Sequence, residues 1–224
     1  DGRPGMVGAI WVDHLTGMLL AFLLMAALRH RNRTGEGQYI QLSMAENLIA
    51  SIPEATLDYS ISGRQQTRQE NMDMAMSPHN VYRCQDFDKW VAIAVTNEEE
   101  WHALCLAMGH TEWIDDERFA NPLSRWHNQQ ELDKLITEWT MQRTDREAMH
   151  TLQEAGVAAG PIYDADGLAT DPHLNERGCF VPLGEVEGVP YVHLAHPWRL
   201  SDSAVPYYAI APTLGQHTEE VMVD

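Results

Sequence analysis

The sequence predicts an α/β fold, and three observations support that prediction. Residues 14–31 lack proline and are rich in Leu, Ala and Met, which are strong helix formers. Residues 90–95 are consecutively apolar and include β-branched side chains, as is typical of a buried strand. Three later segments each begin with a helix-capping pattern. A chain of 224 residues is long enough to bury a sizeable core beneath such elements.

The first part of the chain is predicted to be mainly helical. Apolar residues cover most of the circumference of the helix over residues 14–31, so we expect burial on nearly all sides. This helix ends at the glycine-rich residues 32–37. Residues 39–42 alternate between apolar and polar and predict a short strand. Residues 44–57 predict a second helix, interrupted or kinked near Pro53.

Three further helices are predicted from their start signals. The first opens with a capping box at residues 96–99, begun by Thr96, and stops at Gly109. The second opens at residues 128–131 and the third at residues 144–147. From residue 156 onward the chain is predicted to be rich in loops, with a turn between short strands near residues 184–190. Residues 211–220 are expected to lead into a final helix.

The charge and the cysteine content limit the choice of partners. The chain carries 33 Asp and Glu against 15 Lys and Arg, a net charge of −18 with neutral histidines. Such a chain repels phosphate backbones and anionic lipid, so we expect neither nucleic acid nor a membrane as partner. The longest apolar run, residues 18–28, is too short to span a bilayer. Three separated cysteines without a CxxC pattern fit a reducing cytoplasm and predict no structural metal.

Asp13 is the carboxylate of greatest interest. It is the only acidic residue between Met6 and Glu36 and lies between two apolar stretches, so we expect it to be partly desolvated. The first turn of the following helix would favour its anion. Such an Asp can serve as a nucleophile or as an acid/base group. Asp is also a preferred helix cap, and spacing alone favours that structural role over a catalytic one.

Other candidate groups do not form a convincing site. His193 and His196 lie in a segment predicted as strand and turn, where their spacing does not converge on a metal. The basic cluster at residues 29–33 lies at a helix C-terminus, where cations offset the helix dipole, although it could also meet a phosphate. Three methionines could pack on an apolar ligand, but filling of the linker or core is the commoner role: Met72, Met74 and Met76.

Six blocks of sequence, in order, cover almost the whole chain. They are DHLTG (13–17) with RTGEGQ (33–38), PHNVYRC (78–84), DERFA (116–120), AGVAAGP (155–161), DPHL (171–174) and PTLGQH (212–217). Together they resemble the class III CoA-transferases, the family of formyl-CoA:oxalate CoA-transferase, carnitine CoA-transferases and α-methylacyl-CoA racemase. Asp13 stands where the family has its catalytic Asp, which moves our preference from a capping role to a catalytic one.

The resemblance implies transfer of CoA from an acyl-CoA to a small carboxylic acid. Ionised Asp13 would attack the thioester, and an aspartyl anhydride and an aspartyl-CoA thioester would follow. Coenzyme A is then a substrate, and no permanent cofactor or metal is implied. The alternatives are an acyl-CoA racemase, in which an Asp and a His transfer protons, and a non-catalytic remnant. The chain assigns no CoA-binding residue.

The resemblance also implies a doubly wound, Rossmann-like large domain with a smaller α+β domain inserted in it. Residues 1–60 would belong to the large domain, residues 61–77 to a linker, and residues 78–190 to the small domain. Residues 191–224 would form the return linker and the C-terminal segment of the large domain. Family members form interlocked homodimers, so we expect one. The family's chain also begins with a long α/β segment, so we expect these residues to be the C-terminal part of a larger enzyme.

The segment before Pro78 bears on the acyl group. Formyl-CoA:oxalate transferases carry a run of glycines at the matching position, whereas residues 73–76 here read DMAM. Glycines let a loop fold tightly over a small dicarboxylate, and methionine side chains suggest a bulkier or more apolar acyl group. We therefore do not expect oxalate as the substrate.

Overall fold

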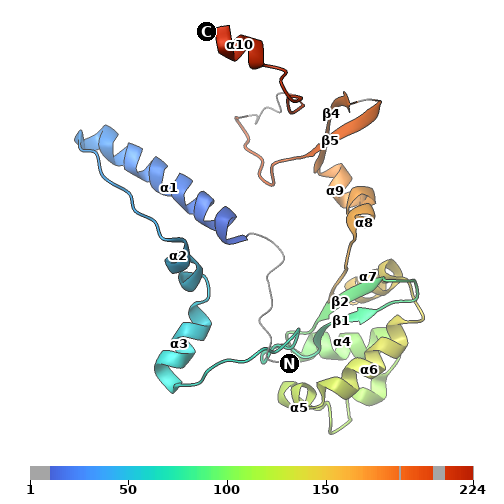
Figure 1. Cartoon of the computed structure of the whole chain (residues 1–224). Coiled ribbons are helices and arrows are strands. Elements are labelled where there is room, and N and C mark those ends of the chain that lie inside the picture. Colours follow the sequence, from blue (N-terminus) through green and yellow to red (C-terminus); the bar gives the residue numbers. More distant parts are fainter. Residues whose placement is uncertain (1–10, 187, 204–209, 224) are drawn as a thin grey trace. The chain divides into compact units, whose positions relative to one another are not determined.

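The computed structural model describes residues 11–186, 188–203 and 210–223. The chain divides into two compact units. Figure 1 labels their helices and strands along the sequence. We call Asp1–Gln69 the helical unit and Glu70–Asp224 the sheet unit, and each is described by itself. The α/β prediction is confirmed at the level of helices combined with two small sheets. All strand pairings among the described residues are antiparallel.

The helical unit contains three described helices: α1 (Trp11–Thr34), α2 (Met44–Ala50) and α3 (Pro53–Ser62). The predicted first helix is confirmed and is longer than expected at both ends. It ends where Gly35 adopts a φ of +81° and its N–H donates to the carbonyl of Arg31 at 2.8 Å. Pro53 occupies the first turn of α3, where a missing N–H costs nothing. The predicted interruption near Pro53 is therefore confirmed.

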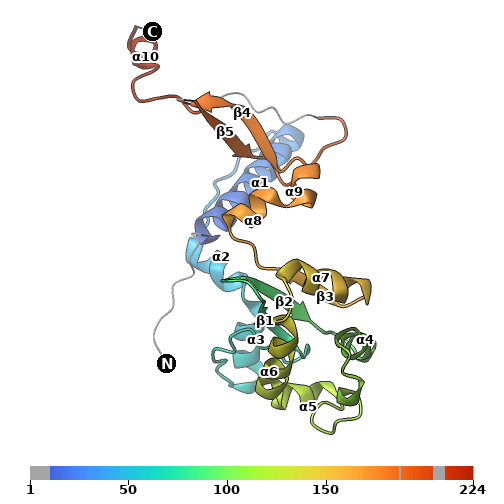
Figure 2. The same ribbon diagram turned by 90° about the vertical axis from the view of Figure 1, so that its right-hand side faces the viewer.

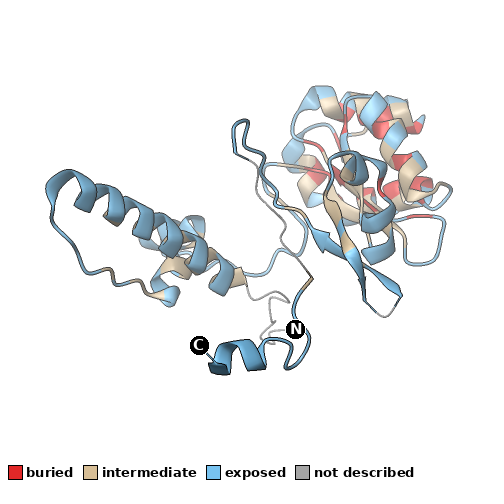
Figure 3. Ribbon diagram, turned by 90° about the horizontal axis from the view of Figure 1, so that it is seen from above, coloured by how far each residue is buried: buried red, intermediate tan, exposed pale blue. Residues whose placement is uncertain are grey.

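Two expectations for the helical unit are wrong. No residue of α1 is buried, and α2 is the described helix that packs most closely against it. Figure 3 shows this long helix exposed along most of its length. Residues 39–42 form no strand, since no other described segment of the unit offers a partner for a hydrogen-bonded ladder.

Helix α1 also corrects the expectation drawn from its 11-residue apolar run. Among the described residues it is the one helix that is long and apolar enough to cross a membrane, judged by length and composition alone. Core helices of soluble proteins share both properties.

The sheet unit is built around the strands β1 (His79–Arg83), β2 (Trp90–Ala94) and β3 (Ala158–Pro161). They form an antiparallel sheet in the order β1-β2-β3, with β2 in the centre. Five helical elements lie between β2 and β3 in the chain: α4 (Glu98–Met108), the 3-10 helix η1 (Thr111–Trp113), α5 (Pro122–His127), α6 (Gln129–Thr140) and α7 (Asp145–Glu154).

One face of this sheet forms the core with the helices. The alternate residues Val91, Ile93 and Val95 are buried, as the period of two in a strand requires. They join a cluster of apolar side chains from the helices that includes Trp101, Leu104, Leu132, Ile136 and Leu152. Figure 3 shows the buried residues, in red, gathered in this part of the molecule. The predicted strand at residues 90–95 is confirmed.

The three capping signals have different outcomes. Thr144 and Glu147 form the predicted capping box, and the Gly109 stop has a left-handed φ of +79°. The cap of α4 is Asn97 rather than Thr96, since the Asn97 side chain accepts from the N–H of Glu100 at 2.8 Å. Asn128 precedes α6 as predicted, but its side chain donates to two backbone carbonyls instead of capping.

The remainder of the sheet unit contains short elements: α8 (Ala165–Thr170), α9 (Pro172–Glu176), β4 (Phe180–Val186), β5 (Val189–Leu194) and α10 (Thr218–Val223). Strands β4 and β5 pair as the orange hairpin in Figure 2. This confirms the two short strands, but residues 184–186 and 189–190, predicted as turn, belong to the strands. Helix α10 confirms the predicted final helix. Strand β3 was wrongly expected to be loop, because its Ala, Gly and Pro residues all have low strand propensity.

Candidate functional site

Asp13 is the third residue of α1 and lies in its first turn. The residue that caps a helix precedes the helix, so the interpretation of Asp13 as a cap is wrong. The first-turn N–H groups of a helix have no partner within it and carry a partial positive charge. The fold therefore places the carboxylate beside these first-turn N–H groups.

Asp13 is exposed among the described residues, so the expected desolvation is not observed. Helix geometry explains the difference. Trp11, Val12, Leu15 and Thr16 are half-buried and share one face of α1, whereas Asp13 lies at the edge of that face. Flanking apolar residues thus do not bury Asp13, because consecutive residues of a helix point in different directions.

Gly17 lies one turn after Asp13 and leaves space beside it. A Cβ atom at Gly17 would meet no atom within 4 Å. Side chains in a helix lean toward its N-terminus, so a larger residue at position 17 would cover the turn that holds Asp13. Glycine within a helix costs about 1 kcal/mol relative to alanine.

A hydrogen bond ties the neighbouring turn of α1 to α2. The Nδ2 atom of Asn47 donates to Oγ1 of Thr16 at 3.1 Å. Because Thr16 accepts this bond, its own hydroxyl hydrogen can be donated elsewhere, and the Asn47 amide retains a second hydrogen. The Ser43 side chain caps α2 by accepting from the N–H of Glu46, which fixes the start of the helix that carries Asn47.

Asp13, Thr16, Gly17 and Asn47 together form what we call the Asp13 site. The sequence indicated Asp13 alone. The sequence signal that could have indicated Gly17 was the presence of a glycine within a segment of helix formers. Thr16 and Asn47 are 31 residues apart and follow no motif, so their contact required the structure.

The Asp13 site contains an exposed carboxylate with hydrogen-bonding groups on the same helix. An exposed carboxylate can approach a carbonyl carbon, and the first-turn N–H groups and the Thr16 hydroxyl are donors of the kind that stabilise an oxyanion. His14 follows Asp13 directly, and adjacent residues of a helix do not face each other. Asp13 and His14 therefore do not form a facing pair.

The other groups that the sequence singled out lie elsewhere in the fold. His193 is on β5, and His196 stacks on Trp198 with ring centroids 4.9 Å apart. Within the described ranges, no group of three or more His, Cys, Asp or Glu side chains could hold a metal ion. Arg31 and Arg33 lie in the last turn of α1, where they complement the helix dipole as predicted.

The cysteines that are fully buried are poor nucleophiles. Burial raises the pKa of Cys84 to about 11 and that of Cys105 to about 12. The reactive form of a cysteine is its thiolate, which is scarce at neutral pH at such values. Cys84 and Cys105 are therefore structural residues.

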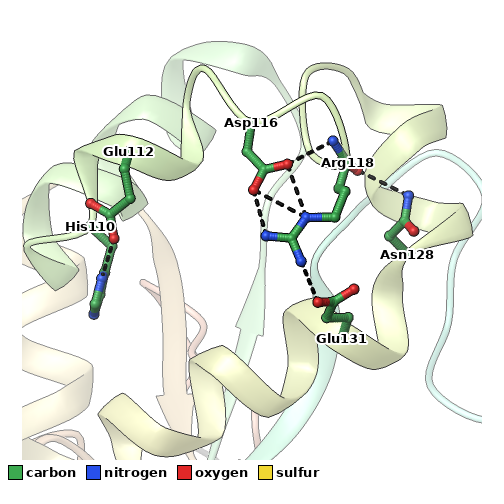
Figure 4. Close-up of polar contacts among 6 residues, drawn as sticks. All are labelled: His110, Glu112, Asp116, Arg118, Asn128 and Glu131. Carbon is green, nitrogen blue, oxygen red and sulfur yellow. Dashed lines mark hydrogen bonds and ion pairs between the residues drawn. The ribbon is translucent and has the colours of Figure 1, made fainter.

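The DERFA block at residues 116–120 makes polar contacts that link a surface loop to α6 (Figure 4). Arg118 pairs with both carboxylate oxygens of Asp116 and also with Glu131 at the start of α6. The Nδ2 atom of Asn128 donates to the Arg118 carbonyl at 3.1 Å. The block thus holds the loop after η1 against α6, and His110 and Glu112 make a separate pair 2.8 Å apart.

Comparison with known proteins assigns the chain to a family. Residues 1–218 match the family model of CoA-transferase family III. The succinate–glutarate CoA-transferase of Agrobacterium fabrum is 29% identical over 224 residues, which cover 100% of this chain and 56% of that protein. The succinyl-CoA–D-citramalate CoA-transferase of Chloroflexus aurantiacus is 31% identical over 229 residues, with 100% and 56% covered.

The fold agrees with this assignment. The crystal structure of a CaiB/BaiF family protein from Brucella suis superposes with a TM-score of 0.82 at 28% identity, covering 100% of this chain and 57% of that one. The chain spans about half the length of the curated relatives it matches. On the family match over residues 1–218, this chain belongs to CoA-transferase family III.

Proposed function

We propose that the protein containing this chain moves CoA from an acyl-CoA donor to a carboxylic acid acceptor, with Asp13 as the nucleophile. The observation that carries the proposal is the exposed carboxylate in the first turn of α1, left open by Gly17, in a chain of this family. A carboxylate is suited to this task because it can attack a thioester carbonyl, and the mixed anhydride that forms is reactive enough to acylate the released CoA thiolate.

The reaction proceeds through covalent intermediates on Asp13. A carboxylate oxygen attacks the thioester carbonyl, the C–S bond breaks, and CoA leaves as its thiolate. The thiolate then attacks the aspartyl carbonyl of the mixed anhydride, which releases the donor acid and leaves an aspartyl-CoA thioester. The acceptor carboxylate then attacks the aspartyl-CoA thioester, which forms a second anhydride and releases the CoA thiolate. The thiolate attacks the acceptor carbonyl of this anhydride, so CoA ends on the acceptor and the Asp13 carboxylate is regenerated. No net oxidation or proton transfer takes place.

The neighbours of Asp13 have defined roles in this scheme. Each attack produces an oxyanion, which the first-turn N–H groups and the Thr16 hydroxyl can stabilise. Asn47 positions Thr16 through its hydrogen bond. Gly17 leaves room for the acyl group at the carboxylate.

The substrates are proposed from the relatives and from residues 73–76. The two relatives are named for succinate, glutarate and D-citramalate. Met72 and Met74 are exposed beside a turn in which Asp73 Oδ1 accepts from the N–H of Ala75 at 2.7 Å. We therefore propose an acid larger than oxalate. We also propose that the protein is a cytoplasmic, interlocked homodimer with a Rossmann-like large domain. The domain boundaries in this proposal are those predicted from the sequence.

Trapping of the covalent intermediate tests the function. The intact natural protein is incubated with a panel of acyl-CoAs, treated with hydroxylamine or borohydride, and digested for mass spectrometry of the Asp13 peptide. We expect a mass change at Asp13, which Asp13→Asn abolishes and the control Glu36→Gln preserves. An unmodified peptide across the panel would overturn the proposal. Exchange of the α-hydrogen of a 2-methylacyl-CoA in deuterium oxide, without trapping, would instead support the racemase.

A further inference from the structure

Three methionines alternate along the segment that leads into β1. Met72, Met74 and Met76 are separated by single residues, and all three belong to the sheet unit. Met72 is 36% exposed and Met74 is 63% exposed, whereas Met76 is half-buried. A thioether sulfur is a soft metal ligand, and at least two of these three side chains are in contact with solvent.

Hydrogen bonds close this segment into a loop. The Asn71 side chain donates to Oδ1 of Asn80 at 3.0 Å, and the Asn71 carbonyl oxygen lies 2.5 Å from Nδ1 of His79. Beyond the last methionine, Nε of Arg125 donates to the Ser77 carbonyl at 2.9 Å. We call residues 71–79 the Met loop. Because its first and last residues are in contact, the three methionines between them cannot spread far apart.

An aspartate bends the Met loop from within. Oδ1 of Asp73 accepts from the N–H groups of Ala75 and Met76 at 2.7 and 3.1 Å, which turns the chain between the second and the third methionine. A methionine side chain has three rotatable bonds and a polarisable sulfur, and it adapts readily to what it contacts. The three sulfurs can therefore turn toward one shared ion.

His79, at the closure of the Met loop, has the arrangement of a metal-binding histidine. A carbonyl only accepts, so Nδ1 carries the hydrogen of the neutral ring and Nε2 keeps its lone pair. Histidines that bind metals usually donate their other ring N–H to a carbonyl or carboxylate in this way, which orients the ring. His79 and Asn71 also line a cavity of about 360 Å³, so a small ion can reach the ring from solution.

The ligand set and the charge determine which kind of ion fits. Thioether sulfurs favour Cu(I) and imidazole also suits copper, whereas Mg²⁺, Ca²⁺ and Mn²⁺ take oxygen ligands. The Asp73 carboxylate lies within the loop, and the chain has a net charge of −18. A single positive charge is therefore attracted to this part of the chain although the four ligands themselves are neutral.

We propose that the Met loop binds one Cu(I) ion through the sulfurs of its three methionines and through Nε2 of His79. Four neutral ligands form bonds to the ion, so no proton is released and no electron is transferred. The inference is independent of the proposed function, because it requires neither Asp13 nor an acyl-CoA.

Titration of the chain with Ag(I) tests the proposal. Ag(I) is a soft monovalent ion like Cu(I), and it needs no reductant to keep its oxidation state. The chain carries ¹³C-methyl methionine and ¹⁵N-histidine for NMR, and Cys179→Ser removes its half-buried thiol from every sample. We expect one equivalent of Ag(I) to shift the methyl signals of the three Met-loop methionines and the ring signals of His79.

Substitutions of single ligands follow in the same background. Met74→Leu removes one sulfur at nearly constant volume, so the variant should fold normally. We expect its affinity for Ag(I) to fall by about tenfold or more, since loss of even an outer-shell partner of a metal site costs that much. His79→Gln should weaken binding by a similar factor. The control Met18→Leu makes the same change at a methionine of similar exposure on α1, 66% against 63%, and should leave the affinity unaltered.

The outcomes separate the Met loop from other binding modes. Methyl signals that Ag(I) leaves unmoved, unaltered affinity in Met74→Leu, or an equal response to Mg²⁺ would overturn the inference. Shifts of the His79 ring alone would also overturn it, because the sulfurs would then have no part. Methyl shifts that Met74→Leu weakens and Met18→Leu preserves would support the site, whether or not acyl-CoA is trapped on Asp13.

Discussion

The Asn47 amide donates to the Thr16 hydroxyl at 3.1 Å, one helical turn beyond Asp13. This bond is the described polar link between α1 and α2, and it orients the hydroxyl closest in sequence to the proposed nucleophile. A hydroxyl that accepts one hydrogen bond and donates another can rotate little about its C–O bond. In the proposed reaction Asn47 is therefore a positioning residue that acts through Thr16.

Thr16→Val removes the hydroxyl while it keeps the shape of the side chain. We expect the rate of acyl transfer to Asp13 to fall about fivefold to tenfold, and the free energy of unfolding to fall by about 1 kcal/mol, the usual contribution of one hydrogen bond. Thr16→Ser restores the hydroxyl and should recover most of the rate. Equal rates for the valine and serine variants, measured by quenched single-turnover trapping, would show that the hydroxyl has no part in the reaction.

Gly17 offers a steric test of access to Asp13. Gly17→Leu should slow trapping at Asp13 by about tenfold or more, because a side chain at this position covers the preceding turn. The same change should stabilise the helix, by about 0.8–1 kcal/mol on the propensity scale, so loss of folding cannot explain a loss of rate. Ala21→Leu places the same side chain one turn further along α1 and should leave trapping unchanged. Unaltered trapping in Gly17→Leu would contradict the assigned role of Gly17.

Local signals in the sequence were sufficient for much of the sheet unit. The Thr144–Glu147 capping box, the Gly109 stop and the strand at residues 90–95 depend on neighbouring residues, and all three were correctly predicted. The predicted cap of α4 was one residue too early. Thr96 and Asn97 are both good caps, and the choice between them depends on which glutamate pairs with the capping residue.

The errors concern features that depend on distant partners. A strand at residues 39–42 needs a second strand beside it, and burial of α1 needs surrounding elements. The exposure of Asp13 follows from which face of α1 packs against α2, and no local pattern encodes that face. Strand β3 forms despite poor propensity because β2 and α7 provide its contacts.

Arg125 provides a test of the core of the sheet unit. Its side chain is 1% exposed, and it donates to Glu98, to the carbonyls of Ser77 and Phe119, and lies 4.7 Å from the Trp101 ring. Arg125→Met leaves these acceptors without their donor and should lower the free energy of unfolding by about 3–5 kcal/mol.

The partner of Arg125 supplies the control for that change. The Glu98 side chain is 47% exposed, so Glu98→Gln should cost less than about 1 kcal/mol in urea unfolding. Equal costs for the two variants would mean that the ion pair, rather than the carbonyl contacts, dominates the contribution of Arg125.

Asp58 provides a test of pH dependence at the end of α3. Its carboxylate accepts hydrogen bonds from Arg64 at 2.8 Å, from Ser62 at 2.8 Å and from Gln66 at 3.2 Å. These bonds, led by that of Arg64, lower the pKa of Asp58 from 3.8 to about 2. The folded state then binds this proton less readily than the unfolded state does. The contribution of Asp58 to stability is therefore fully present above pH 3.8 and is lost as the pH falls through about 2.

An NMR titration of the Asp58 carboxyl carbon measures this pKa directly. We expect a midpoint of about 2 in the unaltered chain. In Arg64→Met the midpoint should move up toward 3.8, because the largest cause of the shift is removed. The control Arg31→Met removes one guanidinium from a different helix and should leave the midpoint in place. If Arg64→Met and Arg31→Met raised the midpoint equally, the shift would reflect the general charge of the acidic chain rather than the bond between Arg64 and Asp58.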